Sequence, residues 1–141
     1  EQVTLTPLEE KLLQDFELSK LVVCTDAGLA STANRKFNDK KDRAFITTQS
    51  IKKLKKPLQE WAMDKTGWRI PGKDGLFDIS KIDTDEAVAE AYKSTTFYKE
   101  RWIKENGFEQ RLVVTFSLKY RNYQRSVRQS QIERASDAEF L

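Results

Sequence analysis

Histidine is absent from this 141-residue chain, and cysteine occurs once. The missing histidine excludes a Ser-His-Asp or Cys-His catalytic arrangement and any histidine-containing zinc site within the chain. One cysteine, Cys24, excludes an intrachain disulfide and is typical of a reducing compartment. No apolar run approaches the roughly 20 residues that a membrane helix needs, so no membrane partner is expected. Catalysis by this chain would depend on carboxylates, lysines or tyrosines.

The remaining composition is typical of one soluble globular domain. The chain is long enough for a proper core, and 38% of its residues are hydrophobic. Its 25 basic and 22 acidic residues give a net charge of +3, which is too small to indicate a nucleic-acid partner by itself. The distribution of charge therefore matters more than the total. The chain begins at Glu1 with no signal-peptide pattern, and we expect it to be the middle of a longer protein.

One stretch near the N-terminus organises the predicted fold. Residues 21–24 are consecutive apolar residues, which predicts a strand buried on both faces, with Cys24 packed as a small hydrophobe. Gly28 then permits a turn, and Ser31 can cap the next helix. Asp26 directly follows the strand, where ligands bind in open α/β sheets. Two interpretations stay open here: Asp26 takes part in chemistry, or it only organises the strand-to-helix turn.

Helix and strand patterns alternate through the first half of the chain. The predicted elements are a helix over residues 7–17, a strand over 21–25, a helix over 32–38, a strand over 43–47 and a helix after Ser50. Thr6 is the expected cap of the first helix, Glu9 completes a capping box, and Leu8 lies on the apolar stripe. Pro57 is expected to kink or divide the last helix. This alternation predicts parallel strand pairing with right-handed crossovers.

The pattern changes beyond residue 65. Glycine and proline interrupt residues 66–76, which predicts a loop or a loose hairpin. Asp83 or Thr84 is the expected cap of a short helix that follows. A longer helical pattern begins at Tyr120 and continues to about residue 139.

The Asn106-Gly107 pair lies between two strand patterns and predicts a long antiparallel hairpin with a type I′ turn. Leu112, Val114 and Phe116 should share one face of it, because side chains alternate along a strand. The hairpin is rich in charge, so we expect it to cover another part of the protein rather than to form a core.

Basic residues gather towards the C-terminus. Between residues 111 and 134 only Glu133 is acidic, and the basic residues are Arg111, Lys119, Arg121, Arg125, Arg128 and Arg134. Arg121, Arg125 and Arg128 are spaced to share one helix face, and tyrosines and glutamines interleave with them. This pattern suits contact with a DNA phosphate backbone. The alternative is a surface helix whose arginines pair with acidic residues elsewhere. A second basic run, at residues 52–56, is interpreted as a solvated face.

The carboxylates form no complete metal site in the sequence. Two-metal phosphoryl transfer needs several carboxylates that converge on the ions. Asp26 is the only one at a predicted strand end. The others are interpreted as turn and cap residues, and they are Asp39, Asp42, Asp74, Asp83 and Asp85.

With these residues in view, the chain resembles the DDE transposases of bacterial insertion sequences, which have a ribonuclease-H-like catalytic core. The segments that carry the resemblance are Leu21–Ser31 with Asn34, Ala44–Ile46, Gln110–Ser117, Tyr123–Arg128 and Gln131–Ala135. The first of them is similar to the family's block around its second catalytic aspartate: an apolar strand, Asp, a small residue, Gly, and Asn just beyond. The later segments resemble a subgroup in which a β-rich insertion follows that aspartate.

The resemblance implies an α/β fold in three parts. Residues 1–65 would be part of the ribonuclease-H-like core, with parallel strands and helices. Residues 66–119 would be the β-rich insertion with its antiparallel hairpin, and residues 120–141 a basic C-terminal helix.

The resemblance also implies that Asp26 is the second of three carboxylates that hold Mg²⁺ or Mn²⁺. The first should precede residue 1. The third belongs to a helical pattern of Tyr, two residues, Arg, three residues, Glu, six residues, Lys. The start of this pattern is matched by Tyr98, Arg101 and Glu105. However, Leu112 stands at the Lys position, and Asn106-Gly107 would break the helix. We therefore interpret Glu105 as a false match and expect the third carboxylate beyond residue 141.

The implied activity is metal-dependent cleavage and transfer of DNA strands, with this chain inactive on its own. The partner would be DNA at the transposon ends, in the bacterial cytoplasm at the nucleoid, and a homodimer is an open alternative. The expected DNA contacts are Arg111, Lys119, Arg121, Arg125 and Arg128. Two other interpretations are kept: a non-catalytic nucleic-acid-binding module in which Asp26 is only a turn residue, and a nuclease or resolvase with the same core.

Overall fold

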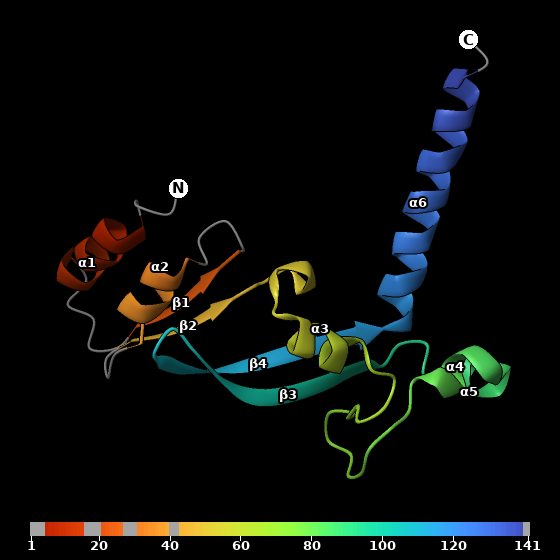
Figure 1. Cartoon of the computed structure of the whole chain (residues 1–141), viewed down its shortest axis with the longest axis horizontal. Coiled ribbons are helices and arrows are strands. Elements are labelled where there is room, and N and C mark those ends of the chain that lie inside the picture. Colours follow the sequence, from red (N-terminus) through yellow and green to blue (C-terminus); the bar gives the residue numbers. More distant parts are fainter. Residues whose placement is uncertain (1–4, 16–20, 27–30, 40–42, 140–141) are drawn as a thin grey trace. The chain divides into compact units, whose positions relative to one another are not determined.

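The computed structural model describes residues 5–15, 21–26, 31–39 and 43–139 (Figure 1). The chain divides into two compact units, residues 1–59 with 104–109 and residues 60–103 with 110–141. The described elements are of mixed α/β type, with a parallel strand pair, an antiparallel hairpin and a C-terminal helix, which confirms the coarse fold prediction. Within the described ranges, no helix combines the length and the apolar character that crossing a membrane requires.

The first unit is built on a parallel strand pair. Its elements are α1 (Leu5–Asp15), β1 (Leu21–Thr25), α2 (Thr32–Phe37), β2 (Arg43–Thr47) and the 3₁₀ helix η2 (Ile51–Lys53). In the β1–β2 ladder Leu21 lies opposite Arg43, and Thr25 lies opposite Thr47. The predicted parallel pairing is therefore confirmed. Helix α3 (Lys56–Met63) follows η2, so the expected division near Pro57 is also confirmed.

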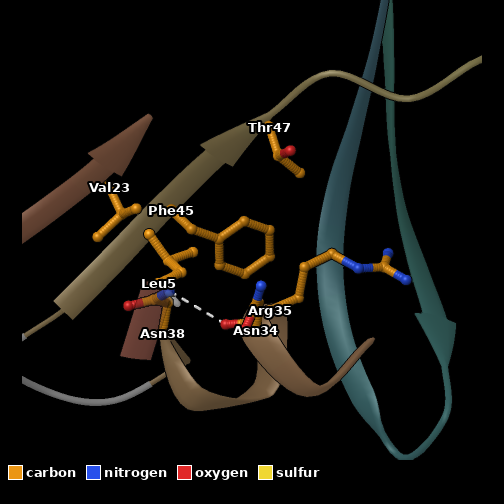
Figure 2. Close-up of a pocket in the computed structure, with 7 residues that line it drawn as sticks. All are labelled: Leu5, Val23, Asn34, Arg35, Asn38, Phe45 and Thr47. Atoms are coloured by element: carbon orange, nitrogen blue, oxygen red, sulfur yellow. Dashed lines mark hydrogen bonds between the residues drawn. The ribbon is translucent and has the colours of Figure 1, made fainter. Parts of the chain in front are cut away.

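The prediction that β1 is buried on both faces is wrong. Val23 and Phe45 are half-buried and line a small cavity of about 10 Å³ together with residues of α1 and α2 (Figure 2). Their neighbours point the other way: Val22 is 61% exposed and Ile46 is 65% exposed. Cys24 is exposed as well, contrary to its expected role as a packed hydrophobe. Within the described residues, helices cover only one face of the sheet, and the alternation of side chains then exposes the other.

Buried polar side chains join α1 to α2. Glu9 and Asn38 are almost fully buried. The Asn38 side-chain amide donates to the Glu9 carboxylate at 3.2 Å. It also donates to the main-chain oxygen of Asn34 at 3.0 Å (Figure 2). Such pairing offsets the cost of removing polar groups from water. Glu9 thus binds a distant residue of the chain.

The ends of α1 and α2 differ in how well they were predicted. Helix α1 begins at Leu5, so Thr6 lies inside the helix and the predicted cap is wrong. Leu8, expected on the buried stripe, is exposed, and Leu5 is buried in its place. The cap of α2 is confirmed, because the Ser31 hydroxyl accepts a hydrogen bond from the Asn34 amide at 3.2 Å. Gly28 lies outside the described residues.

The second unit is built on a hairpin. Its elements, beyond the end of α3, are α4 (Ser80–Thr84), α5 (Glu86–Ala91), α6 (Leu118–Glu139) and the hairpin strands β3 (Thr96–Glu105) and β4 (Phe108–Ser117) up to residue 103 and from residue 110, because the tip at residues 104–109 belongs to the first unit. Asn106 and Gly107 join β3 to β4 with positive φ angles of 53° and 83°. The predicted two-residue turn is confirmed, since a type I′ turn requires positive φ at both positions. Residues 66–76 form the predicted loop, flanked by an isolated bridge between Trp68 and Phe77.

The hairpin supplies the core of this unit, so the prediction that it only covers another part is wrong. Phe97 on β3 has no exposed surface, and its ring stacks on Phe77 with centroids 5.0 Å apart. The buried core comprises Ala62, Trp68, Ile79, Ile82, Phe97, Val114 and Leu118. Leu112 and Phe116 pack against it with Val114, as their alternation predicted. Most charged residues of the hairpin lie outside this core, so a charge-rich hairpin still has an apolar face.

The cap of α5 is a neighbour of the two predicted candidates. Asp85 accepts hydrogen bonds from the amides of Ala87 at 2.9 Å and Val88 at 3.3 Å. Asp83 and Thr84 lie instead inside α4, which ends at residue 84. A carboxylate at this position satisfies amides that have no partner within the helix.

Lys99 is an internal charge of the second unit. Its residue is 4% exposed, and its ammonium donates to the main-chain oxygens of Trp61 at 2.9 Å and Asp64 at 2.7 Å. These carbonyls lie at the C-terminal end of α3, where a cation is favourable. The ammonium also lies 4.8 Å from the ring centre of Trp68. Burial lowers the pKa of Lys99, and the nearby Asp64 carboxylate opposes this shift.

Lys99→Ala should lower the free energy of unfolding by about 2–3 kcal/mol, because it removes the donor to two part-buried main-chain oxygens, of which only that of Asp64 keeps another donor, the Trp68 indole. Urea unfolding followed by circular dichroism measures this loss. Lys104→Ala is the matched control, because Lys104 is exposed on the same strand; it should change stability by less than about 0.5 kcal/mol. Equal losses for the two variants would contradict a bonding role for Lys99.

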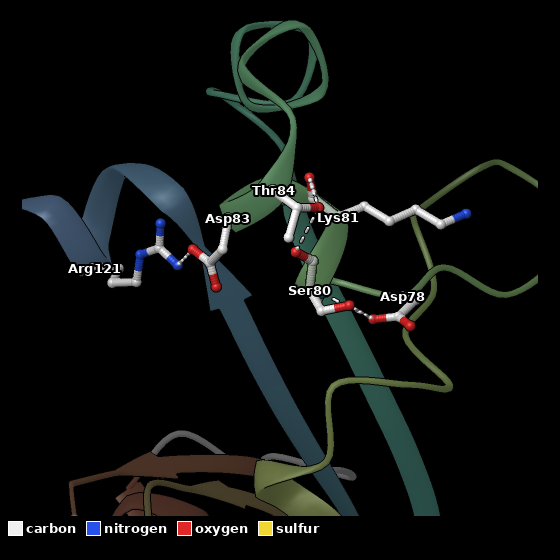
Figure 3. A network of polar contacts seen from close by, with 6 residues as sticks. All are labelled: Asp78, Ser80, Lys81, Asp83, Thr84 and Arg121. Atoms are coloured by element: carbon white, nitrogen blue, oxygen red, sulfur yellow. Dashed lines mark hydrogen bonds and ion pairs between the residues drawn. The ribbon is translucent and has the colours of Figure 1, made fainter.

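Asp78 organises the start of α4. Its carboxylate accepts hydrogen bonds from the Ser80 amide at 2.9 Å and the Ser80 hydroxyl at 2.6 Å (Figure 3). These bonds lower the pKa of Asp78 below its ordinary value of 3.8. Because the pKa is lower in the folded state, the ionised carboxylate stabilises the fold above pH 3.8. This stabilisation is lost as the pH falls through the folded-state pKa.

Asp78→Asn should therefore lower stability at neutral pH, and the difference from the parent chain should shrink below pH 3.8. Thermal unfolding at a series of pH values provides the measurement. Asp74→Asn is the control, since Asp74 is exposed in the adjacent loop. A difference that stays constant with pH would show that the Asp78 charge is not involved.

Candidate functional site

Asp26 lies at the carboxyl edge of the parallel strand pair in the first unit. It follows the last residue of β1, and its residue is exposed. The hydroxyl of Thr47, the last residue of β2, donates to the main-chain oxygen of Asp26 at 3.2 Å. The two strand ends are thus tied together beside this carboxylate. In open α/β sheets this edge is where ligands bind.

The described part of the chain does not give Asp26 a complete set of metal ligands. Among the described residues, no group of three or more His, Cys, Asp or Glu side chains could hold a metal ion. Asp26 fits one ligand position of a Mg²⁺ site, because carboxylate oxygen is what this ion prefers. The described residues do not fit the whole site.

Glu105 does not complete such a site. It ends strand β3, and Tyr98 and Arg101 lie on the same strand. Residues spaced three and seven apart share a face in a helix, whereas side chains alternate every residue in a strand. The helical motif that these three residues match in sequence is therefore not formed, in agreement with the expected break at Asn106-Gly107.

A second candidate site is helix α6, in the second unit. Ser117 precedes this helix, and its hydroxyl accepts a hydrogen bond from the Tyr120 amide at 3.1 Å. The predicted long C-terminal helix is confirmed, with its start two residues earlier than expected. From residue 122 to residue 138 every side chain is exposed. Residues 118–132 contain four basic side chains and no acidic one, so this surface is strongly positive.

Two of the five predicted DNA-contacting residues have acidic partners. Arg121 donates to the Asp83 carboxylate at 2.8 Å (Figure 3). Its guanidinium also lies 5.6 Å from the ring centre of Phe116. Arg111 lies on β4, away from α6 in sequence, and is 3.5 Å from the Glu100 carboxylate. For these two residues the structure favours the alternative interpretation, in which the arginines pair with acidic residues elsewhere in the chain.

The other three residues keep their charge available on α6. Lys119, Arg125 and Arg128 are exposed, and no ion pair within the described residues involves them. Exposed arginines on a helix without acidic neighbours can contact phosphates. Arg125 and Arg128 share one helix face and form the basic surface of α6, whereas Lys119 lies on another face.

A shallow depression lies along one side of α6. Its volume is about 330 Å³, and it is lined by Tyr120, Tyr123, Gln124, Val127, Arg128 and Gln131. Tyr120 is 60% exposed and Tyr123 is 64% exposed, and their rings are nearly parallel, 27° apart, with centroids separated by 6.4 Å. The sequence interpretation had grouped the tyrosines and glutamines with the arginines but had missed Val127. The spacing of these residues by three, four and seven positions was the signal that could have located the depression.

Comparisons of the chain with protein-family models, with curated proteins and with solved structures found no match.

Proposed function

We propose that this chain is the part of a DDE transposase that carries its second metal-binding carboxylate, Asp26. The observation that supports this most directly is the position of Asp26, an exposed carboxylate at the carboxyl edge of two parallel strands linked through a helix. The resemblance of residues 21–31 to the family's aspartate block supports the same assignment.

The chemistry would be phosphoryl transfer on DNA. Mg²⁺ or Mn²⁺ held by several carboxylates supplies activation of the attacking oxygen and stabilisation of the leaving oxygen. Asp26 would provide one of these ligands, and Thr47 would hold the adjoining backbone in place. Because the described residues contain no group of three or more His, Cys, Asp or Glu side chains that could hold a metal ion, we propose this activity for the full-length protein and not for this chain alone.

The basic surface of α6 would position the DNA. Arg125 and Arg128 of this surface, and Lys119 on another face of the helix, are cationic, exposed and without an ion pair within the described residues. Contacts of this kind go to phosphates, so they would hold DNA without reading its sequence.

The second candidate is a non-catalytic nucleic-acid-binding module. It is favoured by the absence of a carboxylate cluster from the described residues, since the α6 surface does not depend on a metal site. In that case Asp26 would only organise the strand-to-helix turn.

Asp26→Asn in the full-length protein should reduce metal-dependent DNA cleavage by roughly 1,000-fold, because a lost metal ligand removes several kcal/mol of transition-state stabilisation. The DNA affinity should be unchanged, since Asp26 is not part of the basic surface. Cleavage of a labelled duplex and its binding are measured side by side. Asp39→Asn is the control, because Asp39 is an exposed carboxylate that follows α2. Full cleavage by the Asp26 variant would support the binding module.

Arg125→Gln/Arg128→Gln should weaken duplex binding by the chain and flatten its salt dependence. Each phosphate contact contributes about 0.9 to the slope of log affinity against log salt, so the slope should fall by about 2. Fluorescence anisotropy at several salt concentrations measures it. Arg134→Gln is the matched control on another face of the same exposed helix. If Arg134→Gln lowered the slope by as much per removed charge, duplex binding would depend on the overall charge of the chain and not on this surface.

A further inference from the structure

We propose that the depression on α6 binds unpaired bases of single-stranded DNA, which stack on the rings of Tyr120 and Tyr123. This inference rests on the proposed function and adds to it a substrate form, DNA that is not base-paired. The phosphates would be held by the basic surface next to the depression.

The two tyrosines provide the stacking surface. Both rings are largely exposed, although aromatic rings of this size usually bury much of their area. Their nearly parallel arrangement, with centroids 6.4 Å apart, presents two aromatic faces on consecutive turns of one helix. Every base has a flat aromatic face, so a pair of exposed rings binds unpaired bases with little dependence on sequence. In duplex DNA these faces are covered by neighbouring base pairs.

The rest of the depression suits a nucleotide strand. Gln124 and Gln131 carry amide groups that both donate and accept hydrogen bonds, as base edges do. Arg128 lines the same depression, and its guanidinium has no ion pair within the described residues. Residues 118–132 contain no acidic side chain that would repel a phosphate.

A partner helix of another protein suits this surface less well. A helix that packed along the depression would bury Gln124, Arg128 and Gln131 together with Val127. A helix–helix seam requires apolar residues at these spacings, and burying unpaired amides and a guanidinium is costly. The charge and polarity of the depression therefore favour an anionic, base-bearing strand.

The test compares two fluorescein-labelled probes, a short oligothymidylate and a blunt duplex of equal length, in buffer that contains EDTA. Tyr120→Ala/Tyr123→Ala in this chain should weaken oligothymidylate binding by roughly 30-fold, from the lower end of the stacking contribution for two bases. Duplex binding should change little, because phosphates and not bases are contacted there. Tyr120→Phe/Tyr123→Phe should retain oligothymidylate binding, since the rings stay and only the hydroxyls are removed.

Ile132→Ala is the control for the loss of an exposed apolar side chain, because Ile132 is 49% exposed and does not line the depression. Circular dichroism should show the same helix content in all variants, as the substituted side chains are exposed. The proposal is overturned if the alanine pair weakens both probes equally, or weakens neither. If the duplex still binds in that case, the DNA contact proposed for the basic surface stands. If neither probe binds the unmodified chain, that contact fails as well.

Discussion

The two-residue turn at Asn106-Gly107 is the constraint on which the β3–β4 hairpin depends. Positive φ at both positions closes the hairpin with β3 and β4 in one register. That register places Phe97 and Lys99 on the same face as Val114. A slip of one residue would turn this whole set to the opposite face, because side chains alternate along a strand. Three features follow from this register. They are the apolar core, the contact of Lys99 with the end of α3, and the anchoring of α6 through Leu118.

In the first unit the corresponding constraint is the parallel ladder. Pairing of Thr25 with Thr47 brings the carboxyl ends of β1 and β2 to one edge, and Asp26 is the next residue after that edge. A carboxylate at this position is exposed because the backbone leaves the sheet there. The proposed metal-binding role therefore depends on strand pairing. The buried pair of Glu9 and Asn38 supports the arrangement by joining the helices beside the sheet.

The arginines on one face of α6 have two different roles, which depend on whether an acidic partner lies nearby. Arg121 lies at the base of the helix, where Asp83 of α4 and the Phe116 ring are within reach, so its charge is used within the fold. Arg125 and Arg128 lie one and two turns farther along, where every side chain is exposed. Their charges are left for an external anion. An exposed ion pair contributes little to stability, so Arg121 chiefly orients the start of the helix.

The amino-acid sequence by itself determined much of the local structure, with the caps of α1 and α5 as exceptions. The parallel order of helix and strand, the Ser31 cap, the Asn106-Gly107 turn and the long C-terminal helix were all predictable, because each depends on periodicity or on backbone preferences of a few neighbouring residues. The position of Asp26 at a strand end was predictable for the same reason.

Only the tertiary structure decided which faces are covered and which charges are paired. The exposure of Cys24, the use of Glu9 as a partner of Asn38 and the pairing of Arg121 with Asp83 depend on residues far away in the chain. Periodicity reports that a segment has two faces, but a face becomes buried only when another element packs on it. Long-range partners are set by the packing of whole elements, and a local sequence pattern does not predict them.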